Sequence, residues 1–264
     1  MRLMAGEIAS DAEALGKRAR LRYLNGDWEG ASALIDEAAL AGVEHPLLAR
    51  LRTAMRGRDG GKKVFCVGWN KTGTTSLEAA LRSLGYATGL QARGERLKAD
   101  WARRDFSRIV ALCRTADAFQ DVPFSCDDTF RALDAHFPGS KFILTLRDNP
   151  EQWYESLVGF HSKIVGKGRV PTAQDLKAFV YRYPGYLWES ARLIYGADES
   201  SVYDRRLYIS CYLNHNRQVT EYFKDRPQDL LVLNVGQADA MEKLCAFLGR
   251  DYRGERMPHL NRSR

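Results

Sequence analysis

Residues 62–84 constrain the fold most strongly, because they have the pattern of a buried strand, a glycine-bounded loop and a helix. Val64 to Val67 form a short apolar run of the kind found in buried parallel strands. Gly68 and Gly73 then bound a turn that delivers unpaired backbone N–H groups to a helix N-terminus, which favours a bound anion. Apolar residues recur at helical spacing after the turn, at Leu77, Ala80, Leu81 and Leu84. The segment therefore predicts a phosphate-binding loop.

The loop departs from the nucleotide-kinase pattern at one position. That pattern has Gly, four residues, then Gly-Lys-Ser/Thr. Gly68 and Gly73 have this spacing, but Thr74 stands where the lysine is expected and a lysine lies inside the loop instead, at Lys71. The sequence Lys-Thr-Gly-Thr-Thr after a buried strand resembles the 5′-phosphosulfate loop of the sulfotransferases. The resemblance implies 3′-phosphoadenosine 5′-phosphosulfate as donor, no metal, and a donor-binding set of Asn70, Lys71, Thr72, Gly73, Thr74 and Thr75.

A second strand, turn and helix follow at residues 141–156. Asn149 suits the N-cap position and Pro150 the first helical position. This segment resembles the 3′-phosphate motif of the same family, in which a strand-end arginine and a helix serine hold the donor's 3′-phosphate. The matching residues are Arg147 and Ser156. A guanidinium fork also suits a phosphate geometrically.

The spacing of this second motif differs from the family's by one residue. Ser156 follows Arg147 by nine positions rather than eight, and Glu155 occupies the eighth, where it would repel a phosphate. The serine still lies six residues after Pro150, as in the family pattern. We therefore expect Asn149 to widen the turn without rotating the helix face.

The resemblance extends from Lys62 to about Asn261 and implies sulfuryl transfer to a hydroxyl or amine. In the family the loop lysine, here Lys71, lies against the bridging oxygen, and the loop hydroxyls lie on the 5′-phosphate. The transition state is loose, by analogy with phosphoryl transfer, so charge builds on the leaving oxygen. Lys71 and the loop amides can stabilise that charge. The product would be adenosine 3′,5′-bisphosphate.

The acceptor's proton needs a general base, for which the sequence offers two main candidates. Asp121 ends a predicted strand and should reach the active edge of the sheet, where a carboxylate can take a proton. It can equally be a turn-forming residue ahead of Pro123. His161, on the helix after Arg147, is the next candidate, although a lone helix histidine is more often structural. His136 and His215 are weaker candidates.

The sequence also allows two other classes of function. An ATP- and Mg²⁺-dependent phosphotransferase would use Thr75 as a metal ligand and Lys71 in place of the missing lysine. A non-catalytic docking protein would rely on the N-terminal helices alone. The acceptor of a sulfotransferase of this kind can be a small molecule, a sugar or a peptide.

Composition limits the partners. The net charge of +7 suits an enzyme whose donor and product are anionic. It does not predict a nucleic-acid partner, because zinc-finger spacing and aromatic RNA-binding signatures are missing. The basic residues between positions 93 and 108 alternate with acids, which is typical of a solvated helix face; they are Arg93, Arg96, Lys98, Arg103, Arg104 and Arg108.

The chain shows neither a membrane-span pattern nor the apolar core of a signal peptide. Its cysteines are odd in number, scattered and without metal-ligand spacing: Cys66, Cys113, Cys126, Cys211 and Cys245. Reduced thiols fit this pattern best. We therefore expect a cytoplasmic protein without a metal site.

Residues 1–60 form a separate helical segment, and residues 61–264 the catalytic domain. Helices are expected at 12–25, 29–41 and 46–55, with a polar glycine-rich hinge at 56–61. The first two resemble one tetratricopeptide-type pair, through Tyr23, Gly26, Trp28, Ala31, Ile35, Ala38 and Pro46. A single repeat cannot form a solenoid. The segment can serve docking or homodimerisation, cover the acceptor site, or only cap the fold.

Beyond residue 61 the pattern predicts an α/β fold with a mostly parallel sheet of about five strands, covered by helices on both faces in a P-loop-like three-layer arrangement. The candidate strands are 64–67, 86–88, 118–121, 142–146 and 230–235. The ligand should lie off their carboxyl ends. Residues 165–200, with an aromatic run at 181–188, build either the acceptor pocket or surface helices.

Overall fold

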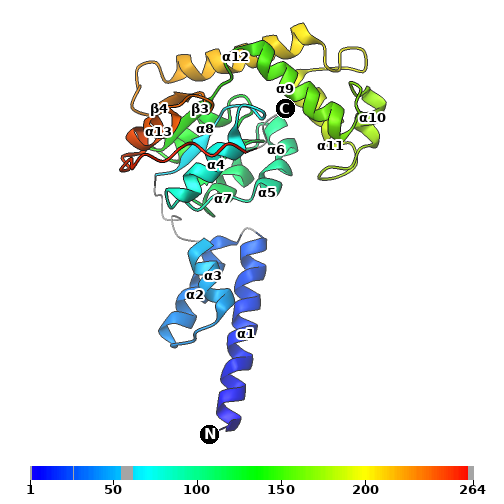
Figure 1. The fold of residues 1–264 in the computed structure, drawn as a ribbon. Helices are drawn as coiled ribbons and strands as arrows, with labels where there is room; N and C mark the ends of the chain where they lie inside the picture. Colours follow the sequence, from blue (N-terminus) through cyan, green and yellow to red (C-terminus); the bar gives the residue numbers. More distant parts are fainter. Residues whose placement is uncertain (1, 26, 55–61, 261–264) are drawn as a thin grey trace.

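The computed structural model of the chain describes residues 2–25, 27–54 and 62–260. A parallel sheet of four strands, in the order β2-β1-β3-β4, lies between helices on both faces (Figure 1). Phe65 is opposite both Phe119 and Phe142, and Phe142 is opposite Leu230. The strands are β1 (Val64–Cys66), β2 (Ala118–Phe119), β3 (Lys141–Thr145) and β4 (Leu230–Leu233). The predicted fold class is confirmed.

The predicted strand at 86–88 is wrong. Only Thr88 forms a β-bridge, with Ala118. The N–H of Ala87 donates to the carboxylate of Asp117 at 2.9 Å rather than to a strand carbonyl, so the ladder does not extend. Gly85, with a φ of +89°, lies immediately before this segment and follows the end of the preceding helix.

The two faces of the sheet carry different side chains because successive strand residues point to opposite sides. Val64, Cys66 and Ile143 pack against α4 (Thr74–Ser83) and α13 (Ala240–Leu248). Phe65 and Phe142 face the other layer, whose helices are α6 (Lys98–Ala102), α7 (Ser107–Cys113), α8 (Thr129–His136) and α12 (Arg205–Tyr222). Burial of both faces explains why β1, β2 and most of β3 are apolar.

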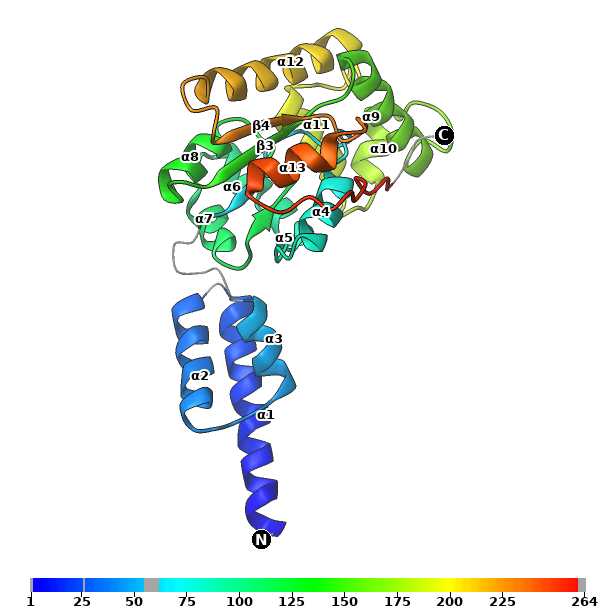
Figure 2. The ribbon, with the colours of Figure 1, turned by 60° about the vertical axis from the view of Figure 1, so that its left-hand side comes forward.

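A further apolar cluster lies past the carboxyl ends of β1 and β3. It contains Trp69, Trp153 and Tyr195, together with residues of three helices that Figures 1 and 2 show grouped at one side of the sheet. These helices are α9 (Pro150–Ile164), α10 (Ala173–Ala178) and α11 (Tyr186–Tyr195). The short helix α5 (Gln91–Glu95) precedes α6.

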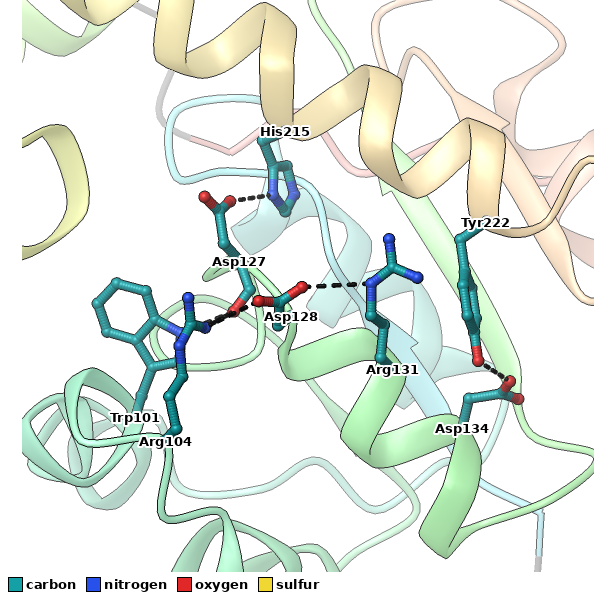
Figure 3. Close-up of polar contacts among 8 residues, drawn as sticks. All are labelled: Trp101, Arg104, Asp127, Asp128, Arg131, Asp134, His215 and Tyr222. Carbon is teal, nitrogen blue, oxygen red and sulfur yellow. Dashed lines mark hydrogen bonds and ion pairs between the residues drawn. The ribbon is translucent and has the colours of Figure 1, made fainter.

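Polar contacts hold α12 against the segment after β2 (Figure 3). The ring of His215 is fully buried, with Nδ1 3.0 Å from Asp127 Oδ1 and Nε2 2.8 Å from the carbonyl oxygen of Val67. Further along α12, the hydroxyl of Tyr222 donates to Asp134 Oδ2 at 2.7 Å. His215 therefore has a structural position behind β1, and it is not among the residues that line the cavity described below.

The N-terminal segment has the three expected helices, with α1 extending further toward the N-terminus than predicted. They are α1 (Arg2–Leu24), α2 (Trp28–Leu40) and α3 (Pro46–Ala54). Their shared core includes Ala19, Ala31, Ile35, Leu48 and Leu51. The predicted hinge at 56–61 lies outside the described residues, and the tetratricopeptide likeness stays a prediction. None of the helices described here has the length and apolar character that crossing a membrane requires.

Candidate active site

The carboxyl ends of β1 and β3 meet at a topological switch point. The chain passes from β1 to β2 on one side and then to β3 on the other side of β1, which is where α/β sheets bind ligands. The two strand ends approach closely at Gly68. A Cβ on that residue would lie 2.1 Å from Thr145 Oγ1, so only glycine fits. The loops after β1 and β3 are thereby brought side by side.

The loop after β1 has the shape of an anion cradle. Lys71 and Gly73 both have left-handed backbones, with φ of +67° and +97°. A Cβ on Gly73 would lie 2.1 Å from Val235 Cγ2. Helix α4 begins directly afterwards, at Thr74, and its first-turn N–H groups have no acceptor within the helix. Such a turn presents donors and a positive helix end to an anion.

The side chain of Thr72 supports this loop from behind. It is fully buried, donates to the carbonyl oxygen of Trp69, and its Oγ1 lies 2.5 Å from Thr145 Oγ1. Thr72 is also not among the cavity-lining residues. The hydroxyl of Thr72 thus joins the loop to β3, and the predicted contact of this residue with the donor stays a prediction. Asn70 does line the cavity, and its carbonyl oxygen accepts from Trp153 Nε1 at 3.1 Å.

Arg147 connects the two loops. Its Nε donates to the carbonyl oxygen of Lys71 at 2.6 Å, and its side chain lines the cavity. Helix α9 starts as predicted, since Asn149 accepts from the N–H of Gln152 at 2.8 Å and Pro150 occupies the first turn. Burial lowers the pKa of Arg147, although Asp148 opposes this.

Ser156 lies half-buried on α9, outside the cavity lining. It comes three residues after Trp153 and four before Phe160, so it shares the helix face that turns toward the loop. That position is compatible with the predicted role next to Arg147.

A cavity of about 280 Å³ opens from these loops. Loop residues, Arg147, Asp121 and His161 line one part of it. The 165–200 segment lines another part, with Leu176, Tyr181, Tyr186, Leu187, Ser190 and Tyr195. Of the two interpretations of this segment, the structure therefore favours the pocket wall.

The amine of Lys71 lies over the ring of Phe160, with Nζ 3.6 Å from the ring centroid. Burial lowers the pKa of Lys71, the negative charge of Asp121 opposes that change, and Arg147 adds to it. The cation is thus held at the mouth of the loop by an aromatic face.

Asp121 is buried beside the first turn of α4. Thr74 Oγ1 donates to its Oδ1 at 3.3 Å, and Gln91 Nε2 donates to its Oδ2 at 2.9 Å. Its φ is +59°, which aspartate tolerates better than most residues. Burial first, and then the negative charge of Glu95, raise the pKa of Asp121 to about 7. The carboxyl group therefore changes protonation near neutral pH, as a general base should.

His161 lies on α9 and lines the same cavity. Its Nδ1 is 2.8 Å from the hydroxyl oxygen of Tyr203. Burial, followed by the positive charge of Lys71, lowers the pKa of His161 to about 4. The ring is therefore neutral at physiological pH and a weaker base than Asp121. His136 is elsewhere, with Nδ1 2.8 Å from the carbonyl oxygen of Ala132 in its own helix.

The prediction that Lys98 lies on a solvated helix face is wrong. Lys98 is fully buried, and its Nζ donates to the carbonyl oxygen of Tyr186 at 2.8 Å and to Ser190 Oγ at 2.7 Å. Burial lowers the pKa of Lys98 to about 8, and Glu189 opposes this. Leu97 and Trp101 mark a buried stripe beside it, but its acceptors lie about ninety positions further along the chain, where no local pattern points.

Gln91, Glu95 and Arg182 were not among the predicted site residues. Gln91 and Glu95 line the cavity next to Asp121, and Arg182 pairs with Glu95 from the wall segment. Within the described ranges, no three His, Cys, Asp or Glu side chains are grouped so as to hold a metal ion.

The parallel sheet, the glycine-bounded loop at the start of α4 and the adjoining cavity define an α/β protein with a candidate ligand site at the switch point of its sheet. The sulfotransferase domain family matches residues 63–264, most of the chain, and the protein belongs to that family. It is therefore a sulfotransferase. A search of curated proteins found no match.

Proposed function

We propose that this sulfotransferase moves a sulfuryl group from 3′-phosphoadenosine 5′-phosphosulfate to a hydroxyl or amine, without a metal ion. One observation carries the proposal: the hydrogen bond from Arg147 Nε to the Lys71 carbonyl oxygen joins two cationic loops at the sheet's switch point. The donor carries phosphate at both ends of its ribose, so two adjacent cationic loops match its chemistry.

The donor set follows from the loop geometry. The first-turn amides of α4 and the hydroxyls of Thr74 and Thr75 would hold the 5′-phosphosulfate, with Asn70 and Gly73 shaping the cradle. Arg147 would hold the 3′-phosphate, assisted by Ser156. Thr72 is left in a supporting role.

With a hydroxyl acceptor, the transfer exchanges one sulfur–oxygen bond for another; with an amine, the new bond is sulfur–nitrogen. The acceptor oxygen forms a bond to sulfur while its proton passes to Asp121, and the bond from sulfur to the 5′-phosphate oxygen breaks with its electron pair on that oxygen. Lys71 stabilises the charge that appears there. His161 lines the same space and is the alternative base.

The acceptor side is enclosed by tyrosines of the 165–200 wall, which favours a small molecule over a sugar chain or a peptide. We assign this chemistry to residues 61–264, whereas residues 1–60 serve docking or dimerisation, cover the acceptor site, or only cap the fold. The five cysteines are free, which supports a reducing compartment such as the cytoplasm.

The test is a comparison of ligands on the full chain. Adenosine 3′,5′-bisphosphate should raise the melting temperature, whereas adenosine 5′-monophosphate and ATP with Mg²⁺ should raise it less. Transfer of ³⁵S from labelled donor is then measured over a panel of phenols, alcohols, amines and sugars. Equal stabilisation by the bisphosphate and the monophosphate would contradict the donor assignment.

A further inference from the structure

One amide bridges two buried carboxylates at the edge of the cavity. Gln91 Nε2 lies 2.9 Å from Asp121 Oδ2 and 3.1 Å from Glu95 Oε1. Asp121 and Glu95 are both buried, at 7% and 5% exposure. The other oxygen of Glu95 pairs with Arg182, which comes from the wall segment. These four side chains form a continuous polar chain, which we call the Gln91 bridge.

We propose that Gln91 and Glu95 are positioning residues that set how readily Asp121 takes the acceptor's proton. The inference rests on the proposed function, which makes Asp121 the base. The amide of Gln91 is not a proton-transfer group, and its Nε2 is engaged by Asp121 and Glu95, while Glu95 is engaged by both Gln91 and Arg182. Both residues therefore act through Asp121.

The two residues act on Asp121 in opposite directions. The negative charge of Glu95 disfavours ionisation of Asp121, because two carboxylates in one buried site repel each other. The N–H groups of Gln91 are donors only, so they favour the ionised form of each carboxylate they contact. The Gln91 amide thus lies between the carboxylates of Asp121 and Glu95 and fixes both of them by hydrogen bonds.

The other groups that face Asp121 come from every neighbouring element. Lys71 in the loop favours its ionised form, as does the Thr74 hydroxyl, while Glu78 on α4 opposes it. Two thiols also face it, Cys66 of β1 and Cys126, and burial raises the pKa of both, so they stay neutral. Tyr181 of the wall contacts Glu95 and is also kept neutral by a raised pKa. Of the charged groups that face Asp121, Glu95 therefore has the largest effect on its ionisation.

Arg182 connects the 165–200 segment to the carboxylate of Glu95 through an ion pair. Its ion pair lowers the pKa of Glu95, against the larger effect of burial, which raises it. Glu95 can repel Asp121 only while it is ionised, so the pairing with Arg182 helps to maintain the effect.

The inference is tested by titrating Asp121 directly in the full-length protein. The chain is labelled with ¹³C at the aspartate carboxyl carbons, and the Asp121 signal is assigned by its loss in Asp121→Asn. We expect its titration midpoint to fall in Glu95→Gln and to rise in Gln91→Leu, with no change in the control Glu155→Gln, an exposed acid on α9. A general loosening of the site would move both variants in the same direction.

The second readout is the pH dependence of sulfate release from the labelled donor to water, which needs no identified acceptor. Its acidic limb should move to lower pH in Glu95→Gln and to higher pH in Gln91→Leu. The inference is overturned if the titration midpoint of Asp121 equals that of wild type in both variants. It is also overturned if the pH profiles of sulfate release do not shift in the same direction as the midpoints. The NMR titration needs no donor, so it tests the Gln91 bridge independently of donor binding. Failure to bind adenosine 3′,5′-bisphosphate would contradict the proposed function alone.

Discussion

Thr74 Oγ1 donates a hydrogen bond to Asp121 Oδ1 at 3.3 Å, so the first residue of the anion-binding helix directly contacts the carboxyl group that we propose as base. Thr74 follows β1 and Asp121 follows β2, and the parallel pairing of these strands brings their ends together. The residues that we propose for donor binding and for proton removal therefore lie one hydrogen bond apart.

Lys71→Ala should lower turnover far more than it lowers affinity for adenosine 3′,5′-bisphosphate. The amine meets charge that develops on the leaving oxygen during transfer, whereas the product is also held by loop amides and Arg147. We expect a rate loss on the order of 10²–10³. Single-turnover transfer and product titration measure the two effects, with the exposed α9 lysine variant Lys163→Ala as control. Normal turnover in Lys71→Ala would contradict the role.

Arg147→Met and Ser156→Ala should both reduce the preference for a 3′-phosphorylated ligand. A charge-assisted fork contributes roughly 1.5–3 kcal/mol and a neutral hydroxyl about 1 kcal/mol, so the arginine variant should lose more. The measurement is the ratio of affinities for adenosine 3′,5′-bisphosphate and adenosine 5′-monophosphate. Ser162→Ala, a half-buried serine on the same helix, is the matched control. An unchanged ratio in both variants would refute the 3′-phosphate assignment.

Asp121→Asn should reduce transfer by about 10²–10⁴ while donor binding is retained. Asparagine keeps the shape and tolerates the left-handed backbone at this position. In the wild-type protein the rate should rise with pH through about 7, because the base acts only when deprotonated. His161→Gln is measured alongside, and a larger loss there with near-normal transfer in Asp121→Asn would reassign the base to His161.

The stability of Asp121→Asn relative to wild type should increase with pH. The folded-state pKa of Asp121 is raised from 3.8 to about 7, so its contribution to stability is present below about pH 4 and is lost as pH rises through 7. Three pH units correspond to at most roughly 4 kcal/mol. Denaturant unfolding between pH 4 and 8 measures this, with exposed Asp251→Asn as control. A stability difference between Asp121→Asn and wild type that does not change with pH would contradict the raised pKa.

Sulfuryl transfer should continue when divalent metal is removed. Lys71, Arg147 and the first-turn amides of α4 can neutralise the donor's phosphates. Activity is compared in EDTA, in EDTA with excess Mg²⁺, and without either. A loss in EDTA that Mg²⁺ restores would show that a metal ion takes part.

The fold was predictable where the determining pattern is local. The strand and loop at 64–73 and the N-cap at Asn149 follow from residue types within a few positions, and the structure reproduces them. The structure of the 86–88 segment was not predictable, because the N–H of Ala87 hydrogen-bonds to the side chain of Asp117 and not to a strand carbonyl. Pairing partners thirty positions apart leave no trace in a local pattern.

The same limit applies to the candidate site. Lys71, Arg147 and Asp121 could be selected because each ends or follows a predicted strand, and the structure brings all three to one cavity. Gln91 and Arg182 could not be selected, since each belongs to an ordinary polar surface pattern until the chain folds. Arg182 is 87 positions from its partner Glu95. Only tertiary packing makes either residue part of the site.

The Arg182–Glu95 ion pair has a consequence for how such an enzyme can diversify. The wall that would select the acceptor is a contiguous stretch of sequence, and so it could be exchanged by insertion or deletion without disturbing the donor loops. Any exchange that removed Arg182 would, however, also alter the electrostatic surroundings of the base. Under this arrangement, acceptor range and pH optimum would be inherited together rather than evolve as independent traits.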